Sequence, residues 1–210
     1  MRYLSLALVL ALSSCGESQP EQVEPTPAQV EPEPAPVTHE CVEFGDGNRP
    51  GDKIANAVFQ NCLGERVELQ STCGEYPLKV VTVSTVWCGA CKSYLRSLTY
   101  DHQISRGGWD YMILVAQNAE RENNVTLEQC MAYAEEVDAD PAKVVLDPGF
   151  RMSIGGGLID NCGDGNISLP FMAILDGWDH TYEFSQGCGG SAANGYTNWR
   201  DAFLGEIYEE

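Results

Sequence analysis

The sequence predicts an α/β fold with a mixed central sheet flanked by helices and an N-terminal β-hairpin. Three observations indicate this fold. Strand and helix patterns alternate through the middle of the chain, a hairpin pattern surrounds Asp176-Gly177, and an amphipathic pattern covers residues 196–208. Together they predict one domain over residues 41–210.

The domain is expected to begin irregularly. Residues 41–56 are rich in Gly, Asp and Asn, which disfavour regular structure. Residues 57–60 and 66–70 then predict two short strands, with a turn near Leu63-Gly64 between them. This is the N-terminal hairpin.

The central elements have stronger patterns. Residues 79–86 (KVVTVSTV) form a β-branched run typical of a buried central strand. A helix is expected over about residues 89–104, ended by Gly107-Gly108, and residues 111–116 predict another strand.

The second half repeats the alternation. Thr126 can cap a helix that runs to about residue 137, and residues 143–146 predict a short strand. Residues 171–175 and 181–184 predict the hairpin, and the last helix follows it.

The first residues resemble a bacterial lipoprotein signal. Met1-Arg2-Tyr3 is a short positive start, and residues 4–12 form an apolar run too short to span a bilayer. The run ends in Leu12-Ser13-Ser14-Cys15, which resembles the lipobox. The resemblance implies that residues 1–14 are a signal peptide and that Cys15 is acylated after cleavage. The alternative is an ordinary secretory peptide with an incidental cysteine.

Residues 15–40 are expected to form a disordered tether behind this lipidated cysteine. Residues 16–40 hold six prolines and few apolar side chains beyond Val and Ala, so they cannot bury enough surface to fold. We therefore expect the domain in the bacterial cell envelope, lipid-anchored on the extracytoplasmic, periplasm-facing side. Membrane contact would be through the anchor alone.

Charge and cysteine content narrow the class of protein. The formal net charge is −19, and such an acidic surface repels nucleic acid and anionic lipid headgroups, so neither is an expected partner. Nine cysteines are many for a cytosolic protein of 210 residues. Exported proteins use cysteines as disulfide staples, which favours an oxidising compartment.

The chemistry is carried by Trp87-Cys88-Gly89-Ala90-Cys91, which follows the expected buried strand and opens the expected helix. The two-residue gap brings both sulfurs into the first helical turn. Unpaired N–H groups and the helix dipole favour a negative sulfur there. We expect a lowered pKa for the Cys88 thiol, with Cys88 as nucleophile and Cys91 resolving the mixed disulfide. No cofactor is expected beyond this redox-active disulfide.

These residues resemble the active-site motif of the thioredoxin superfamily, closest to its exported TlpA/ResA-like, or redoxin, branch. Residues 168–177 (SLPFMAILDG) are similar to that family's cis-proline loop and the strand after it. The resemblance covers roughly residues 55–208. It implies a thioredoxin-like fold, a cis bond before Pro170, and substrate contacts by the backbone of Leu169 and by Pro170.

The resemblance also implies a function in cell redox homeostasis. The expected activity is disulfide exchange with the thiols of exported proteins, supported by an unidentified redox partner. The sequence leaves its direction, reduction or oxidation, open. Trp87 is expected to pack beside the disulfide and to touch substrates.

The chain departs from the family at three positions. Thr82 stands where thioredoxins have a buried Asp, Tyr94 where ResA-like proteins have a Glu, and Ala90 where Pro is usual. Both acids assist proton transfer at the second sulfur, so the group that does this here is open. We predict a more oxidising pair than that of thioredoxin.

Six further cysteines are favoured as structural disulfides, with fifteen possible pairings. They are Cys41, Cys62, Cys73, Cys130, Cys162 and Cys188. Nearness in sequence suggests Cys62 with Cys73 across the hairpin and Cys162 with Cys188 near the proline loop. The alternative is a second redox pair that recharges Cys88–Cys91.

Two other functions compete with exchange. A peroxiredoxin-like peroxidase would use Thr85, three residues before Cys88, but Val81 stands where that family has proline. A non-catalytic, disulfide-stapled lipoprotein that binds a partner is the other alternative. Zinc is not expected because no second close Cys or His pair exists, and Lys92 stands where c-type haem attachment needs His.

Overall fold

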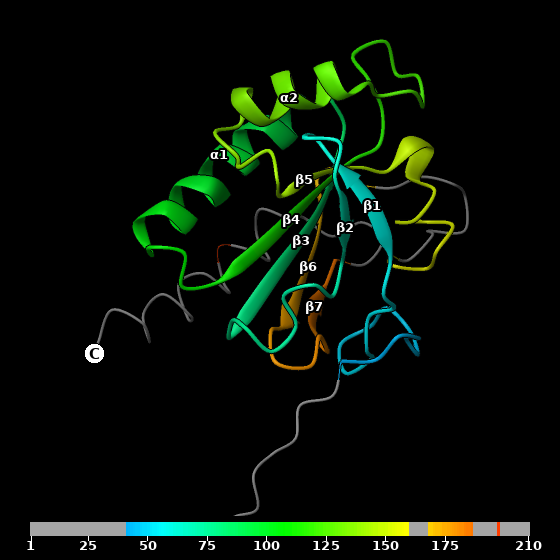
Figure 1. The fold of residues 1–210 in the computed structure, drawn as a ribbon, viewed down its shortest axis with the longest axis vertical. Helices are drawn as coiled ribbons and strands as arrows, with labels where there is room; N and C mark the ends of the chain where they lie inside the picture. The colour runs from blue at the N-terminus through cyan, green and yellow to red at the C-terminus, as the bar shows by residue number, and fades with distance from the viewer. Residues whose placement is uncertain (1–40, 160–167, 187–196, 198–210) are drawn as a thin grey trace, which may run out of the picture. The chain divides into compact units, whose positions relative to one another are not determined.

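The structure is a computed structural model that describes residues 41–159, 168–186 and 197 (Figure 1). Its strands are β1 (Val58–Asn61), β2 (Arg66–Glu68), β3 (Leu78–Ser84), β4 (Asp110–Val115), β5 (Val144–Leu146), β6 (Phe171–Asp176) and β7 (Tyr182–Ser185). Its helices are α1 (Gly89–Ile104), α2 (Leu127–Glu136) and the short 3-10 helix η1 (Pro148–Phe150). Within this part of the chain, no helix is both long and apolar enough to cross a bilayer.

The described strands form one mixed sheet in the order β2-β1-β5-β4-β3-β6-β7. β3, β4 and β5 run parallel, while β6 and β7 continue the sheet antiparallel on one side and β1 and β2 on the other. Every residue of β3 is buried, as its β-branched run predicted. The expected mixed sheet and N-terminal hairpin are confirmed.

Helices α1 and α2 cover the same face of the sheet (Figure 1). Their apolar sides share one core cluster, which includes Leu95 from α1 and Tyr133 from α2. Arg96 Nε donates to the carbonyl of Glu136 at 2.9 Å, so the two helices also contact each other directly. This packing holds the start of α1 against the sheet.

The opposite face is covered by irregular chain. Ile54 from the lead-in packs there with Leu158 and Ile159, which follow η1. The N–H of Ile54 donates to the carbonyl of His180 at 3.1 Å, and Lys53 forms a β-bridge with Thr181. The lead-in is therefore irregular, as expected, yet it is hydrogen-bonded to the start of β7.

Local signals predicted the helix ends well. Helix α1 has the expected bounds and is followed by Gly107 at a φ of +70°, a conformation that other residues rarely adopt. Thr126 and Gln129 form a capping box at α2. Strand ends differ by at most two residues from expectation, because tertiary pairing decides them. The expected final helix, residues 196–208, lies outside the described residues apart from Thr197, and so do the signal peptide, Cys15 and the tether.

Candidate functional site: the Cys88–Cys91 pair

Cys88 and Cys91 form a disulfide at the start of α1, with an S–S distance of 2.01 Å. Cys88 is the N-cap residue, with extended φ and ψ of −82° and 97°. Its Sγ accepts the backbone N–H of Cys91 at 3.1 Å. The sulfur therefore takes the place that a Ser or Asp oxygen takes in an ordinary helix cap.

The two sulfurs differ in access. Cys88 has 6% of its surface exposed and Cys91 has none. Of the two residues, only Cys88 keeps any contact with solvent. The helix N-terminus favours negative charge at the first sulfur. This arrangement suits Cys88 as attacking group and Cys91 as resolving group.

The expected proline loop lies at the same edge of the sheet. The Leu169–Pro170 bond is cis, as the resemblance implied. Phe171 pairs with Val83, so Pro170 comes next to the end of β3, from which the chain continues to Cys88. Leu169 and Pro170 are partly buried, and Leu169 packs against the core on the face away from the helices.

Trp87 is held by a loop far along the chain. Its ring is 37% exposed, and its Nε1 donates to Oε1 of Gln117 at 3.0 Å. Gln117 in turn donates to Oδ1 of Asn123 at 3.1 Å, and Arg121 lies over the Trp87 ring. Gln117, Arg121 and Asn123 were not predicted as site residues, because no local sequence pattern links residues 117–123 to residue 87.

Thr82 and Tyr94, which stand where the family has acidic residues, come together in the core. Tyr94 donates its hydroxyl to Sδ of Met172 at 2.8 Å, and Met172 pairs with Thr82 across the sheet. Burial raises the pKa of Tyr94 well above its ordinary value, and the nearby Thr82 hydroxyl opposes this shift only in part. Both positions therefore hold uncharged hydroxyl groups at any physiological pH.

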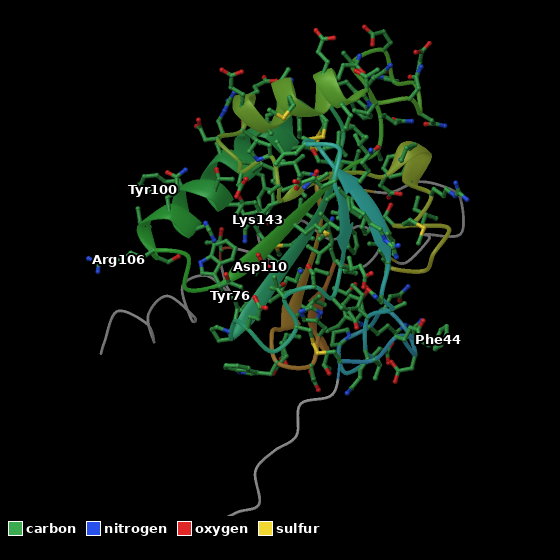
Figure 2. All side chains as sticks on the ribbon, in the orientation of Figure 1. Phe44, Tyr76, Tyr100, Arg106, Asp110 and Lys143 are labelled. Carbon is green, nitrogen blue, oxygen red and sulfur yellow. A yellow bond between two sulfur atoms is a disulfide. The ribbon has the colours of Figure 1, made fainter. Side chains whose placement is uncertain are left out.

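A charged cluster lies at the other end of the sheet. Lys79 is 1% exposed and its Nζ lies 3.0 Å from a carboxylate oxygen of Asp110, whose other oxygen pairs with Lys143 (Figure 2). Burial alone would raise the pKa of Asp110, but the two lysines lower it to about 2. Lys79 lies near the start of β3 and Cys88 follows its end, so this cluster is separated from the site by the length of the strand.

The predicted pairing of Cys62 with Cys73 is wrong. Cys62 is bonded to Cys130 and Cys73 to Cys41. Cys62 faces α2 from the end of β1, whereas Cys73 lies in the turns after β2, where its sulfur contacts the carbonyl of Trp178. The pairing failed because Cys62 lies in the turn of the hairpin, next to α2, whereas Cys73 lies beyond the other end of β2.

These two disulfides are placed as staples. Cys62–Cys130 is buried beneath α2, with exposures of 2% and 0%. Cys41–Cys73 lies by Trp178 in the β6–β7 turn, at the end of the sheet away from Cys88. Neither position suits a relay to Cys88–Cys91. Cys162 and Cys188 lie outside the described residues. Among the residues described, no three His, Cys, Asp or Glu side chains are grouped to bind a metal ion.

Comparisons with known proteins bear on the fold. Neither the family models nor the curated proteins contain a match to this sequence. Solved structures do match. One from Bacteroides thetaiotaomicron, described as a protein disulfide isomerase, has a TM-score of 0.53 and 15% identity over 75% of this chain and 92% of its own. The fold is thioredoxin-like.

Two further solved structures also match this fold. The thioredoxin domain of a thiol-disulfide oxidoreductase from Bacteroides vulgatus has a TM-score of 0.51 and 12% identity, covering 71% of this chain and 96% of that one. A thiol:disulfide interchange protein DsbE from Chlorobium tepidum, so described, has a TM-score of 0.51 and 15% identity over 75% and 98%. At these identities the likeness concerns the thioredoxin-like fold.

Proposed function

We propose that this chain is a thiol–disulfide oxidoreductase that exchanges disulfides with exported proteins through Cys88 and Cys91. One observation carries the proposal: the disulfide caps α1, with Cys88 retaining 6% exposure and Cys91 fully buried behind it. Structural likeness to thiol-disulfide oxidoreductases supports it. The cis-proline loop at the same edge offers backbone groups to a client segment.

The exchange proceeds in two displacements. The Cys88 thiolate attacks one sulfur of a client disulfide, and the other client sulfur leaves with the bonding electrons as a thiolate. Cys91 loses its proton to solvent and attacks the Cys88 sulfur, which releases the second client sulfur as a thiolate. Two electrons have then passed to the client and Cys88–Cys91 is oxidised. The reverse sequence oxidises a client dithiol, and a dithiol or disulfide partner in the envelope restores the pair.

A trapping experiment tests this function. In the full-length Cys91→Ser variant, the mixed disulfide on Cys88 cannot be resolved. Expressed in a bacterial envelope, it should accumulate adducts that dithiothreitol releases, and mass spectrometry then identifies the clients. The double variant with Cys88→Ser is the control and should trap nothing. Equal yields from both variants, together with no reduction of insulin by the wild type, would refute the proposal.

The two alternatives have their own measurements. A peroxidase would consume hydrogen peroxide rapidly in the presence of dithiothreitol, with sulfenic acid at Cys88. A non-catalytic binding lipoprotein would keep Cys88–Cys91 intact in mild reductant and would not reduce insulin. We expect neither result, because a disulfide sulfur that caps a helix N-terminus is a good target for thiolate attack.

A further inference from the structure

The guanidinium group of Arg121 lies over the ring of Trp87, the residue that precedes Cys88. The guanidinium carbon of Arg121 lies 4.6 Å from the centre of the Trp87 ring, and Trp87 directly precedes Cys88. Arg121 comes from the loop between β4 and α2, more than thirty residues along the chain. Trp87 is 37% exposed and Arg121 is also exposed, so a client bound at Cys88 would contact both side chains.

The loop is built to present this side chain. Asn118 is buried, and its Oδ1 accepts the backbone N–H groups of Glu120 at 3.0 Å and Glu122 at 2.8 Å. Its Nδ2 donates to Oδ1 of Asn124 at 2.8 Å. These bonds hold Arg121 between them at a φ of +66°, a left-handed conformation that is strained for an ordinary residue. The loop accepts this strain, and the result aims Arg121 at Trp87.

The ring beneath Arg121 is also held in place. Gln117 accepts from Trp87 Nε1 and is itself held by its bond to Asn123, so the indole cannot turn without breaking its bond to Gln117. Stacking on a fixed ring orders the guanidinium while leaving its N–H groups at the edge. No carboxylate forms an ion pair with Arg121 among the described residues.

The charges nearest in sequence and in the site are acidic or already paired. Lys92 pairs with Glu136 at 2.9 Å, and the Glu122 side chain accepts from Asn118. Glu120 and Glu122 flank Arg121, and the chain as a whole carries a net charge of −19, which disfavours an approaching carboxylate. Arg121 places a positive charge over Trp87 within these acidic surroundings.

We propose that Arg121 determines substrate specificity: it binds a carboxylate that the client carries beside its reacting cysteine. This inference rests on the proposed exchange function. A guanidinium with open N–H groups binds a carboxylate through two parallel hydrogen bonds, which also fixes the orientation of the client. The chain would then prefer cysteines flanked by Asp or Glu, although its overall charge favours basic clients.

The experiment uses three synthetic peptide disulfides that carry Glu, Gln or Lys next to the cysteine. Reduced full-length protein is mixed with each peptide, and single-turnover rates are followed by release of peptide thiol. No other reductant is present, so each turnover converts the protein dithiol to Cys88–Cys91. The wild type should reduce the Glu peptide faster than the Arg121 variants reduce it.

Arg121→Asn removes the charge and keeps a residue that tolerates positive φ. It should slow the Glu peptide about threefold to fivefold, the size of an exposed ion pair, and leave the Gln peptide within twofold. The effect should lie in binding and disappear in 1 M salt. Arg121→Lys should keep part of the preference. The matched control is Arg106→Asn, an exposed arginine at a φ of +55° beyond the opposite end of α1 (Figure 2).

The outcomes separate the two proposals. If Arg121→Asn slows all three peptides equally, Arg121 acts on the Cys88 thiolate or on loop order, and the specificity role is overturned. If Arg106→Asn changes the preference as much as Arg121→Asn, it is overturned as well. If the wild type reduces none of the peptides, the exchange function itself fails and the inference falls with it.

Discussion

Tyr94 and Thr82 bring two hydroxyl groups to the buried side of the site, where the thioredoxin and ResA-like patterns have carboxyl groups. A carboxylate at this depth could accept the Cys91 proton. A tyrosine whose pKa is raised by burial stays protonated and cannot. The chain must therefore use solvent or a group outside the family pattern for this step.

Replacing Tyr94 by Phe tests this reading. The pH dependence of insulin reduction between pH 5 and 9 should keep its position, because the hydroxyl does not titrate in that range. Loss of the bond to Met172 should lower the free energy of unfolding by about 1 kcal/mol. Tyr100→Phe, an exposed tyrosine of the same helix, is the control (Figure 2). A displaced pH profile in Tyr94→Phe alone would make Tyr94 a proton-transfer group.

The Cys88 thiol should titrate below the pKa of about 8.5 that free cysteine shows. At the N-terminus of α1 the thiolate gains the Cys91 N–H as donor and the positive end of the helix dipole. Stabilising the thiolate stabilises the reduced form. Because Ala90 and the uncharged Thr82 and Tyr94 replace the residues of the family pattern, the redox potential should lie above that of thioredoxin in the same buffer. Rates of alkylation against pH and equilibration with glutathione measure both. An ordinary thiol pKa, or a potential at or below that of thioredoxin, would contradict the prediction.

The turn between β6 and β7 buries the side chain of His180. Neither ring nitrogen of His180 has a hydrogen-bond partner among the described residues. Burial, and then the charge of Lys79, lowers the pKa of His180 to about 4. The imidazole is therefore neutral in the folded chain at pH 7, and protonation favours unfolding.

The stability of the fold should consequently depend on pH through His180. The unfolded histidine binds a proton near pH 6.5, so the folded state binds fewer protons between pH 6.5 and about 4. The free energy of unfolding is retained above this window and should fall by about 2 kcal/mol from pH 7 to pH 5. His180→Asn, which suits the φ of +57° at this position, should remove that loss in urea titrations. Equal losses in both proteins would refute the assignment.

The disulfide between Cys62, just after β1, and Cys130 in α2 joins two residues that are 68 positions apart in the sequence. Closing a loop of this length restricts the unfolded chain by about 4 kcal/mol. The double variant Cys62→Ala/Cys130→Ala should lose about 3–4 kcal/mol in urea unfolding, because it loses this restriction and some buried volume. Its rate of insulin reduction under folding conditions should stay within twofold of wild type. A large loss of rate in a folded variant would indicate that this pair takes part in exchange.

We propose that the folded domain and the N-terminal segment have separate tasks. In this proposal, acylated Cys15 holds the domain on the extracytoplasmic side of the envelope, behind a proline-rich tether. Nothing in the domain's acidic charge would attract it to anionic lipid on its own.

Replacing Cys15 by Ser should therefore release the protein from the membrane. In fractionated cells the wild type should sediment with membranes and carry a fatty-acyl mass on Cys15, while Cys15→Ser should be recovered in the aqueous fraction or retain its leader. The reactivity of the Cys88–Cys91 pair should be equal in both. Membrane retention of a cleaved Cys15→Ser protein would show that another segment anchors it.

Much of the fold could be read from local patterns. The bounds of α1 follow from the Cys-x-x-Cys start and the glycines after Ile104, and those of α2 from the Thr126 capping box. β3 follows from its β-branched run. Disulfide partners could not be read, because Cys62 and Cys130 meet only after α2 packs on the sheet.

The sequence by itself determined the setting of the Cys88–Cys91 pair: a buried strand leading into Cys88-Gly89-Ala90-Cys91 at a helix start, with a proline loop before a second strand. Each of these depends on residues within a turn or a strand of one another. Tertiary structure alone decided that Arg121 covers Trp87, that Tyr94 meets Met172 and that Cys62 pairs with Cys130. These contacts span 34 to 78 residues, and over such distances the order of strands in the sheet decides which side chains meet.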